Sequence, residues 1–168
     1  PLLIQAGQSG RGQAFAARWA ELVFVIHHNL EAGKVSYKKF KEMVAANGRD
    51  PNSVSVAPAC YVIVGETDEV AQAKRAAIEA TARPVDALVL ISEVLNYDFG
   101  SKGYDEPFSD EELAGFSWHG FRERVVQFSG KKNPTVRDFV EVSGRGTIAE
   151  HKVFCGSPKS VADQMEEW

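Results

Sequence analysis

Cysteine is scarce in this chain, which contains only Cys60 and Cys155 among its 168 residues. The two lie far apart in the sequence and neither belongs to a CxxC pair, which excludes a disulfide framework as the organising element of the fold. Free, buried thiols of this kind are typical of a protein that works in the reducing cytoplasm, which is the location we expect.

Long hydrophobic runs are also missing. The longest, at residues 85–94, stops well before the roughly twenty residues that a membrane-spanning helix needs. The chain starts at Pro1 without the basic segment of a signal peptide. With 44% hydrophobic and 25% charged residues, the composition predicts a soluble protein with one packed core and no membrane contact.

A strong charge of either sign is absent, because the formal net charge is only −4. Proteins that bind nucleic acid need a basic surface, so no nucleic-acid partner is expected. Histidine is rare as well, and the adjacent residues His27 and His28 would point to opposite faces of a strand. They do not form a metal site together, and we predict no bound metal.

Strand-like and helix-like segments alternate in the first half of the chain. Apolar and β-branched runs, typical of strands buried on both faces, are followed by segments of helical periodicity. The predicted strands are 2–5, 22–26 and 54–64, and the predicted helices are 13–19, 30–47 and 68–82. Pro58 predicts a bend partway along the third strand. Such alternation favours an α/β fold with a parallel sheet covered by helices.

The second half lacks this alternation. Residues 84–151 have the pattern of loops and short helices, with a helix over 86–95, a capping box at 109–112 and a helix that begins at 133–135. Ser157 and Pro158 then predict the start of a last helix. We therefore expect a single domain over 1–168, with 84–151 as a helical insertion.

A glycine-rich loop joins the first predicted strand to the first predicted helix. Gly7, Gly10 and Gly12 allow a ligand to approach the backbone, and Ser9 adds a hydroxyl donor. The N–H groups of such a loop converge where the helix dipole attracts an anion, which predicts a phosphate site. The alternative is an ordinary strand-to-helix turn whose glycines merely permit the bend.

The spacing of this loop excludes two common phosphate ligands. A P-loop requires a lysine after its second glycine, and none is present. A dinucleotide site requires a third glycine where Phe15 stands, and an acidic residue after the next strand, where 27–29 read His-His-Asn. A ligand with a single phosphate, such as FMN or a phosphorylated sugar, remains.

Several short motifs, taken in their order and spacing, resemble one enzyme family. They are Gln5-Ala6-Gly7-Gln8-Ser9, the segments 20–24, 48–51, 64–67, 96–99, 105–108 and 143–147, and the pair 156–158 and 161–164. With these motifs the chain resembles the bacterial luciferase-like flavin monooxygenases along its whole length. Within them it is most similar to the nitrilotriacetate and EDTA monooxygenase group.

The resemblance implies part of a (β/α)8 TIM barrel, about strands 5 to 7 with their helices. It also implies an enzyme that uses FMNH2 from a partner flavin reductase, together with O2, to oxidise an aminopolycarboxylate such as nitrilotriacetate or EDTA. The loop after the first strand corresponds to the family's flavin phosphate site. Its implied cofactor-binding residues are Ala6, Gly7, Gln8, Ser9 and Gly10, with the Ser9 side chain and the N–H groups of Gln8 and Gly10 in direct contact.

The chain departs from this family in length, because a full barrel takes about 250 residues. The first four strands, which hold most flavin-ring contacts in the family, have no counterpart here, and neither does the eighth. We therefore expect a fragment that is inactive by itself. Three parallel strands leave unpaired edges, so a missing segment or a homo-oligomer is expected to cover them.

A polycarboxylate substrate requires cations in its site. Arg145 is the best candidate, because Gly144 and Gly146 would let its loop reach over a ligand. His27 or His28 is a second candidate, since residues at the end of a barrel strand often face the active site. Other basic residues, most of them expected to be solvated, are Arg83, Arg122, Arg124, Lys131 and Lys132, and His119 and His151 are expected to be structural or in a loop.

Two other functions remain open. One is a non-catalytic α/β module that binds a phosphorylated small molecule or a partner protein through the same loop. The other is a related desulfurisation or alkane monooxygenase, because barrel motifs do not fix the substrate. Arg11 is either a further phosphate partner or an exposed arginine without a ligand.

Overall fold

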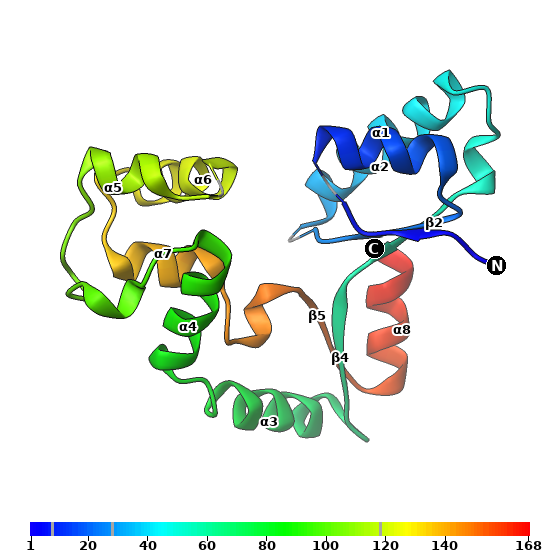
Figure 1. Cartoon of the computed structure of the whole chain (residues 1–168). Coiled ribbons are helices and arrows are strands. Elements are labelled where there is room, and N and C mark those ends of the chain that lie inside the picture. The colour runs from blue at the N-terminus through cyan, green and yellow to red at the C-terminus, as the bar shows by residue number, and fades with distance from the viewer. Residues whose placement is uncertain (8, 28, 118) are drawn as a thin grey trace. The chain divides into compact units, whose positions relative to one another are not determined.

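The structure is a computed structural model of the chain, and it describes residues 1–7, 9–27, 29–117 and 119–168, with only the backbone at His119. These residues form two compact units (Figure 1). The first consists of Pro1–Gln72 and His151–Trp168, and the second of Ala73–Glu150.

Strands and helices alternate in the first unit, whereas helices build the second. The first unit contains β1 (Ile4–Gln5), α1 (Gly10–Trp19), β2 (Leu22–Val25), α2 (Leu30–Ala46), the short 3-10 helix η1 (Pro51–Ser53), β3 (Ser55–Pro58), β4 (Cys60–Val64), the start of α3 (Asp68–Glu79), β5 (Lys152–Gly156) and α8 (Pro158–Glu167). The second contains the rest of α3, α4 (Pro84–Leu95), η2 (Phe99–Ser101), α5 (Asp110–Gly115), α6 (His119–Ser129), α7 (Val136–Ser143) and η3 (Ile148–Glu150).

Three strands of the first unit form a parallel sheet in the order β1-β2-β3. In its register Ile4 lies opposite Leu22, and Leu22 lies opposite Ser55. Helices α1 and α2 connect these strands, because parallel neighbours need a long crossover. The predicted α/β class with a parallel sheet is confirmed.

Helices α1 and α2 cover one face of this sheet (Figure 1). Val23 and Val25 of β2 are 2% and 8% exposed, and they belong to one apolar cluster with Ala17 of α1 and Phe40 of α2. Phe24 points to the opposite face, because side chains alternate along a strand, and it is 40% exposed. The sheet therefore has a covered face and, within the described residues, an open one.

The third predicted strand is divided between two sheets. Its first part, β3, pairs with β2, and its second part, β4, pairs with β5. The division falls at Ala59, directly after Pro58, where the sequence predicts a bend. The Ala59 N–H still donates to the carbonyl of Val25 at 2.8 Å, so the strand changes partner within a single residue.

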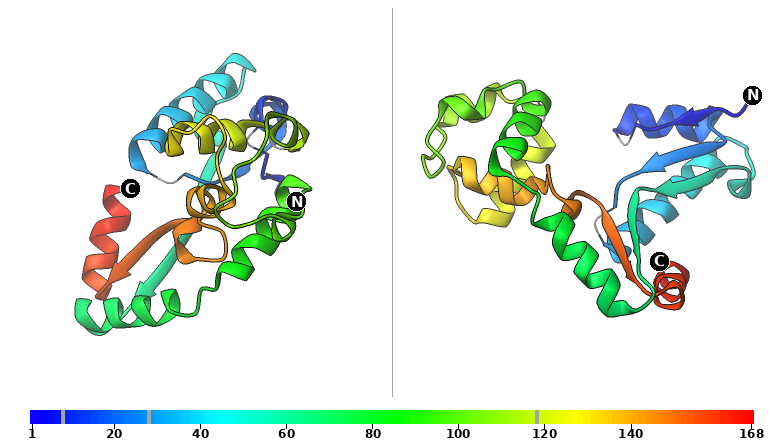
Figure 2. Two further views of the ribbon diagram at one scale, coloured as in Figure 1. Left: turned by 90° about the vertical axis from the view of Figure 1, so that its left-hand side faces the viewer. Right: turned by 90° about the horizontal axis from the view of Figure 1, so that it is seen from below.

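Strand β5 is absent from the strands that the sequence predicts. It runs parallel to β4, with Cys60 opposite Lys152 and Val64 opposite Gly156, and α8 lies beside the pair (Figure 2). Five residues whose partner strand lies far earlier in the chain carry little local signal, which explains the omission. The last helix is confirmed, since Ser157 caps α8 and Pro158 occupies its first turn.

The ends of several helices differ from the prediction. α1 begins at Gly10 rather than at residue 13, because Ser9 is its N-cap. α3 ends at Glu79 rather than at residue 82. In α7 the cap is Thr135, whose hydroxyl accepts from the Asp138 N–H, so the proline before it stays outside the helix. The sequence also does not predict α6.

Aromatic rings form the core of the second unit. Phe99, Phe108, Phe116 and Phe139 are at most 1% exposed. Their ring centroids lie 5.2 to 5.5 Å apart, mostly edge to face. This arrangement brings the positive edge of one ring to the negative face of another, which adds to the gain from burial. The helical segment therefore has a core of its own.

The two thiols are free, as predicted, but only one of them is buried. Cys155 is buried and Cys60 is exposed, so the expectation of two buried thiols is wrong for Cys60, which lies in a strand with one exposed face. In the part of the chain that is described, no helix is both long enough and apolar enough to cross a bilayer.

Candidate functional site

The predicted phosphate loop lies between β1 and α1. Ser9 has an extended backbone and caps α1, and its Oγ accepts a hydrogen bond from the N–H of Gly12 at 3.2 Å. This contact uses a lone pair of the oxygen, so the hydroxyl hydrogen of Ser9 is still available to donate. Ser9 is exposed, and its hydroxyl is therefore accessible to a ligand.

The first backbone N–H groups of α1 have no acceptor among the described residues. In residues 1–7, 9–27, 29–117 and 119–168, no group accepts a hydrogen bond from the N–H of Gly10 or Arg11, and both residues are exposed. The first turn of α1 also contains no acidic side chain. The positive end of the helix dipole is thus uncompensated by these residues, as an anion site requires.

The three glycines of the loop have different surroundings. A Cβ on Gly12 would lie 2.9 Å from the carbonyl oxygen of Gly7, and a Cβ on Gly7 would lie 3.2 Å from the Cα of Gly12. A Cβ on Gly10 would have no atom within 4 Å. A side chain at Gly7 or Gly12 would clash with the backbone of the other residue, so both positions require glycine. The space beside Gly10 is open.

A second helix start, that of α8, provides an internal comparison. Ser157 caps α8 as Ser9 caps α1, but here a carboxylate of the protein occupies the anion position. Asp68 accepts from the N–H of Ser157 at 2.6 Å and from the hydroxyl of Ser160 at 3.0 Å. These hydrogen bonds lower the pKa of Asp68, because they favour its charged form. α8 is thus already capped by an anion, in contrast to α1.

Arg49 fixes the other end of α1. Its guanidinium group donates to the carbonyl of Ala17 at 3.1 Å and to that of Ala20 at 2.8 Å. These carbonyls belong to the last turn and C-cap of α1, where a cation complements the helix dipole. The motif at 48–51, on which the family resemblance partly rests, thus holds α1 in place.

His27 follows β2, as predicted, and lies on the covered side of the sheet. It packs beneath α2, where a Cβ on Gly33 would lie 3.6 Å from the His27 Cδ2. Burial lowers the pKa of His27, because it disfavours the charged imidazolium. The side chain lines a cavity of about 350 Å³ together with Leu30, Gly33, Lys34, Tyr37, Val56, Pro58 and Trp168. His28 lies outside the described residues, as does Gln8.

Arg145 lies in the second unit and already has a partner. Its guanidinium group is 3.4 Å from the carboxylate of Glu150, and both side chains are largely buried. Gly144 and Gly146 have φ values of +62° and +76°, and a Cβ on Gly146 would lie 3.1 Å from the backbone N of Ala87. Both glycines are thus required by the turn itself.

The other predicted cations are engaged as well. Arg83 pairs with Asp86, Lys131 with Asp138 and Lys132 with Asp110, while Arg122 donates to the Leu113 carbonyl and Arg124 lies over the Phe121 ring. His151 contacts the ring of Tyr61, with centroids 5.2 Å apart. In the described part of the chain, no cluster of three or more His, Cys, Asp or Glu side chains could hold a metal ion.

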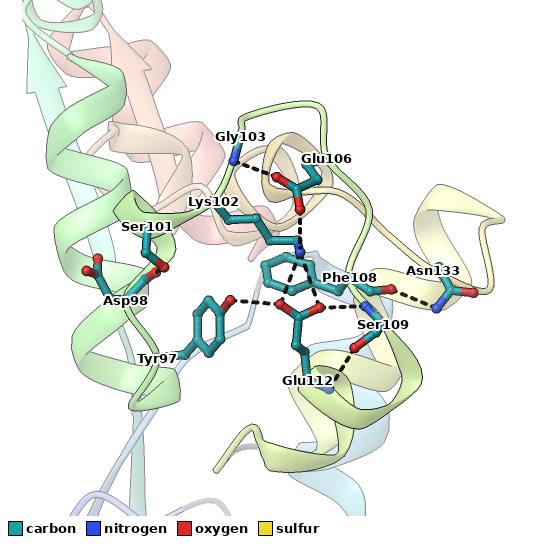
Figure 3. A network of polar contacts seen from close by, with 10 residues as sticks. All are labelled: Tyr97, Asp98, Ser101, Lys102, Gly103, Glu106, Phe108, Ser109, Glu112 and Asn133. Atoms are coloured by element: carbon teal, nitrogen blue, oxygen red, sulfur yellow. Dashed lines mark hydrogen bonds and ion pairs between the residues drawn. The ribbon is translucent and has the colours of Figure 1, made fainter.

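A network of charged groups lies against the aromatic core of the second unit (Figure 3). The Lys102 ammonium group, whose side chain is only 10% exposed, is 2.9 Å from Glu106 Oε1 and 3.0 Å from Glu112 Oε1. Tyr97 donates its hydroxyl to Glu112 at 3.0 Å, and the Ser109 N–H donates to Glu112 at 2.7 Å. The bonds from Ser109 and Lys102 lower the pKa of Glu112 to about 2.

Removing the Glu112 charge is expected to destabilise the second unit in a pH-dependent way. Since its pKa is lower in the folded state, ionised Glu112 stabilises the fold above pH 4.5, and this contribution is lost as the pH falls from there to about 2. Because Glu112 is partly exposed, solvent screens its ion pair with Lys102. Glu112→Gln should therefore lower the unfolding free energy by about 1 to 2 kcal/mol at pH 7. Denaturant titrations of both proteins at pH 7, 4 and 2.5 measure the difference.

The neighbouring acid provides a control for this prediction. Glu111 is exposed in the same helical turn, so Glu111→Gln should change the unfolding free energy by less than about 0.5 kcal/mol. A Glu112→Gln effect that stays constant down to pH 2.5 would contradict the assigned ion pair.

The geometry defines an α/β protein of parallel strands whose first helix begins, among the described residues, with exposed backbone donors and no acidic side chain. The chain belongs to the luciferase-like monooxygenase family, whose pattern it matches over residues 1–168. The family predicted from the sequence motifs is therefore confirmed.

Individual relatives agree with this assignment. The chain is 33% identical over 172 residues to N-acetyl-S-(2-succino)cysteine monooxygenase of Bacillus subtilis and 32% identical over 170 residues to nitrilotriacetate monooxygenase component A of Aminobacter aminovorans. These matches cover 100% of this chain but 38% and 37% of the relatives. The crystal structure of DmoA from Hyphomicrobium sulfonivorans matches with a TM-score of 0.72 and 32% identity, over 100% of this chain and 34% of that one. The chain thus spans little more than a third of the length of these relatives.

Proposed function

We propose that this chain is part of a flavin-dependent monooxygenase and that the loop between β1 and α1 binds the phosphate of FMN. The observation that carries the proposal is the start of α1, where the N–H groups of Gly10 and Arg11 have no acceptor among the described residues. Membership of the luciferase-like monooxygenase family makes a reduced flavin the ligand that best fits such a site.

The residues of the loop fit an FMN phosphate. The phosphate is a dianion with acceptor oxygens only, and the loop offers backbone donors, the Ser9 hydroxyl and the positive end of a helix dipole. The open space at Gly10 lets an oxygen approach the backbone. The exposed guanidinium group of Arg11 adds a positive charge at the same helix start. We therefore propose Ala6, Gly7, Gln8, Ser9 and Gly10 as the loop that surrounds the phosphate.

Reduced FMN, when bound, supplies the electrons with which O2 is activated. The residues of this chain would bind the phosphate end of the coenzyme and so fix the position of its ring. We further propose that a separate flavin reductase supplies FMNH2, since the relative from Aminobacter aminovorans is named as one component of its monooxygenase. The protein would act in the cytoplasm, as a homo-oligomer.

The proposed substrate is a small molecule with several carboxylates, such as an aminopolycarboxylate. Nitrilotriacetate and N-acetyl-S-(2-succino)cysteine, which appear in the names of two relatives, both carry carboxylates. Arg145, His27 and His28 stay predictions as substrate-binding residues. Of these, Arg145 carries the charge that a carboxylate needs, but it would have to exchange Glu150 for the substrate.

Ser9→Ala is expected to weaken FMN binding by the full-length protein by on the order of 1 kcal/mol, about a fivefold rise in Kd. The reason is the loss of a hydrogen bond to a charged group. Riboflavin, which has the same ring and no phosphate, should bind both proteins equally. Titrations that follow flavin fluorescence measure the four dissociation constants.

Ser157→Ala is the matched control. Ser157 caps α8 as Ser9 caps α1, so both variants should lose about 1 kcal/mol of helix capping. Only Ser9→Ala should alter FMN affinity. Equal FMN affinity in the wild type and Ser9→Ala would speak against a flavin phosphate at this loop and favour the non-catalytic module.

A further inference from the structure

The Gln5 side chain folds over the start of the phosphate loop. Its Oε1 accepts a hydrogen bond from the N–H of Gly7. A Cβ on Gly7 would lie 2.9 Å from the Gln5 Nε2 and 3.2 Å from the Gly12 Cα. A side chain at Gly7 would thus collide with both the Gln5 amide and the first turn of α1.

Gln5 is anchored in the sheet. It is the last residue of β1 and lies opposite Val23, which is opposite Val56 in β3. Val23 is only 2% exposed and belongs to the apolar cluster under α1 and α2. The Gln5 side chain therefore connects the covered face of the sheet to the backbone of the loop.

The hydrogen bond between Gln5 and Gly7 determines which backbone N–H groups of the loop are available to a ligand. The N–H of Gly7 donates to Gln5 and is not available to a ligand, whereas those of Gly10 and Arg11 have no acceptor among the described residues. We propose that Gln5 is a positioning residue, which holds Gly7 against Gly12 so that the start of α1 is preorganised for the phosphate. This inference rests on the proposed function of the loop.

The chemistry of the side chain favours an amide at this position. A carboxylate of the same length would accept the same hydrogen bond from Gly7 and would keep the loop in place. It would also place a negative charge beside a site that is proposed to bind a dianion, and the two like charges would repel each other. Gln5→Glu therefore changes the charge beside the loop while keeping its shape. Gln5→Ala removes the hydrogen bond to Gly7 altogether.

The experiment measures FMN and riboflavin affinity of the full-length protein for Gln5→Glu, Gln5→Ala and the control Gln164→Glu. Gln164 of α8 is bonded to the backbone of Cys155 in β5, so its variant adds the same charge at another glutamine that contacts the backbone of a strand. We expect Gln5→Glu to raise the Kd for FMN about tenfold, as a charge repulsion of this kind would, with the melting temperature and riboflavin affinity retained. Gln5→Ala should also weaken FMN binding, and Gln164→Glu should not.

The outcomes distinguish the inference from the function on which it rests. If Ser9→Ala weakens FMN binding while both Gln5 variants bind it like the wild type, the positioning role is overturned and the phosphate site stands. Equal losses of FMN and riboflavin affinity in Gln5→Glu would overturn the role too, because the effect would not depend on the phosphate. If neither Ser9→Ala nor the Gln5 variants change FMN affinity, the proposed site itself is wrong.

Discussion

Gly12→Ala is expected to lower the unfolding free energy by about 1 to 3 kcal/mol and to abolish measurable FMN binding. In most helices this substitution is stabilising, because alanine is the better helix former. Here the added Cβ would lie 2.9 Å from the carbonyl oxygen of Gly7 and 3.0 Å from its Cα, and backbone atoms cannot swing aside. The loop would have to open, and the donors at the start of α1 would lose their arrangement.

Gly10→Ala, two residues earlier, is the matched variant. A Cβ there has no atom within 4 Å, so stability should stay the same or rise by up to about 1 kcal/mol. FMN affinity should still fall, because the ligand needs that open space. Thermal melts and flavin titrations of both variants check this pair. A Gly12→Ala protein that melts and binds FMN like the wild type would show that the loop is not closed as described.

Phe99→Ala is expected to destabilise the second unit by about 3 to 5 kcal/mol. Phe99 is fully buried and contacts Phe108, Phe116 and Phe139, so its removal leaves a cavity among rings that cannot collapse into it. Denaturant unfolding followed by the fluorescence of the chain or by circular dichroism would report the loss. Phe99→Leu should recover more than half of it, because leucine refills most of the volume.

Phe128→Ala is the control for burial. Phe128 is 74% exposed on α6, so its removal should change the unfolding free energy by less than about 0.5 kcal/mol. Similar losses in Phe99→Ala and Phe128→Ala would mean that the aromatic cluster is not the core of this unit.

The parallel sheet could be predicted because its signals are local. The predicted strands 2–5 and 22–26 and the predicted helix 30–47 are continuous stretches of sequence, and the structure contains them as β1, β2 and α2. Strand β5 and the division at Ala59 depend on which strands pair across a long separation. Periodicity carries no information on such pairing, so the sequence predicts one long strand where the structure has two short ones.

The candidate site shows the same limit. Ser9 and the glycines could be located from the pattern, but which glycine has open space beside it depends on contacts that no motif reveals. A Cβ on Gly7 or on Gly12 would meet the backbone of the other residue, whereas a Cβ on Gly10 would have no atom within 4 Å. Gln5 is part of the motif on which the family resemblance rests, yet only the structure shows that its side chain accepts a hydrogen bond from Gly7. A glutamine placed two residues before a glycine at a strand end is a signal that could have drawn attention to it.

The pairing of β4 with β5 has a consequence for the helical segment between them. Ala73–Glu150 leaves the first unit after β4 and returns through β5, and these neighbours are hydrogen-bonded along their length. Because the two strands are parallel, the segment leaves at the carboxyl end of β4, beside Gly156, and returns at the amino end of β5, opposite Cys60. The sheet therefore fixes the distance that the segment has to span. Closing a flexible loop twice as long costs only about 0.6 kcal/mol more, so the length of the segment matters little to stability as long as the segment spans these two strand ends.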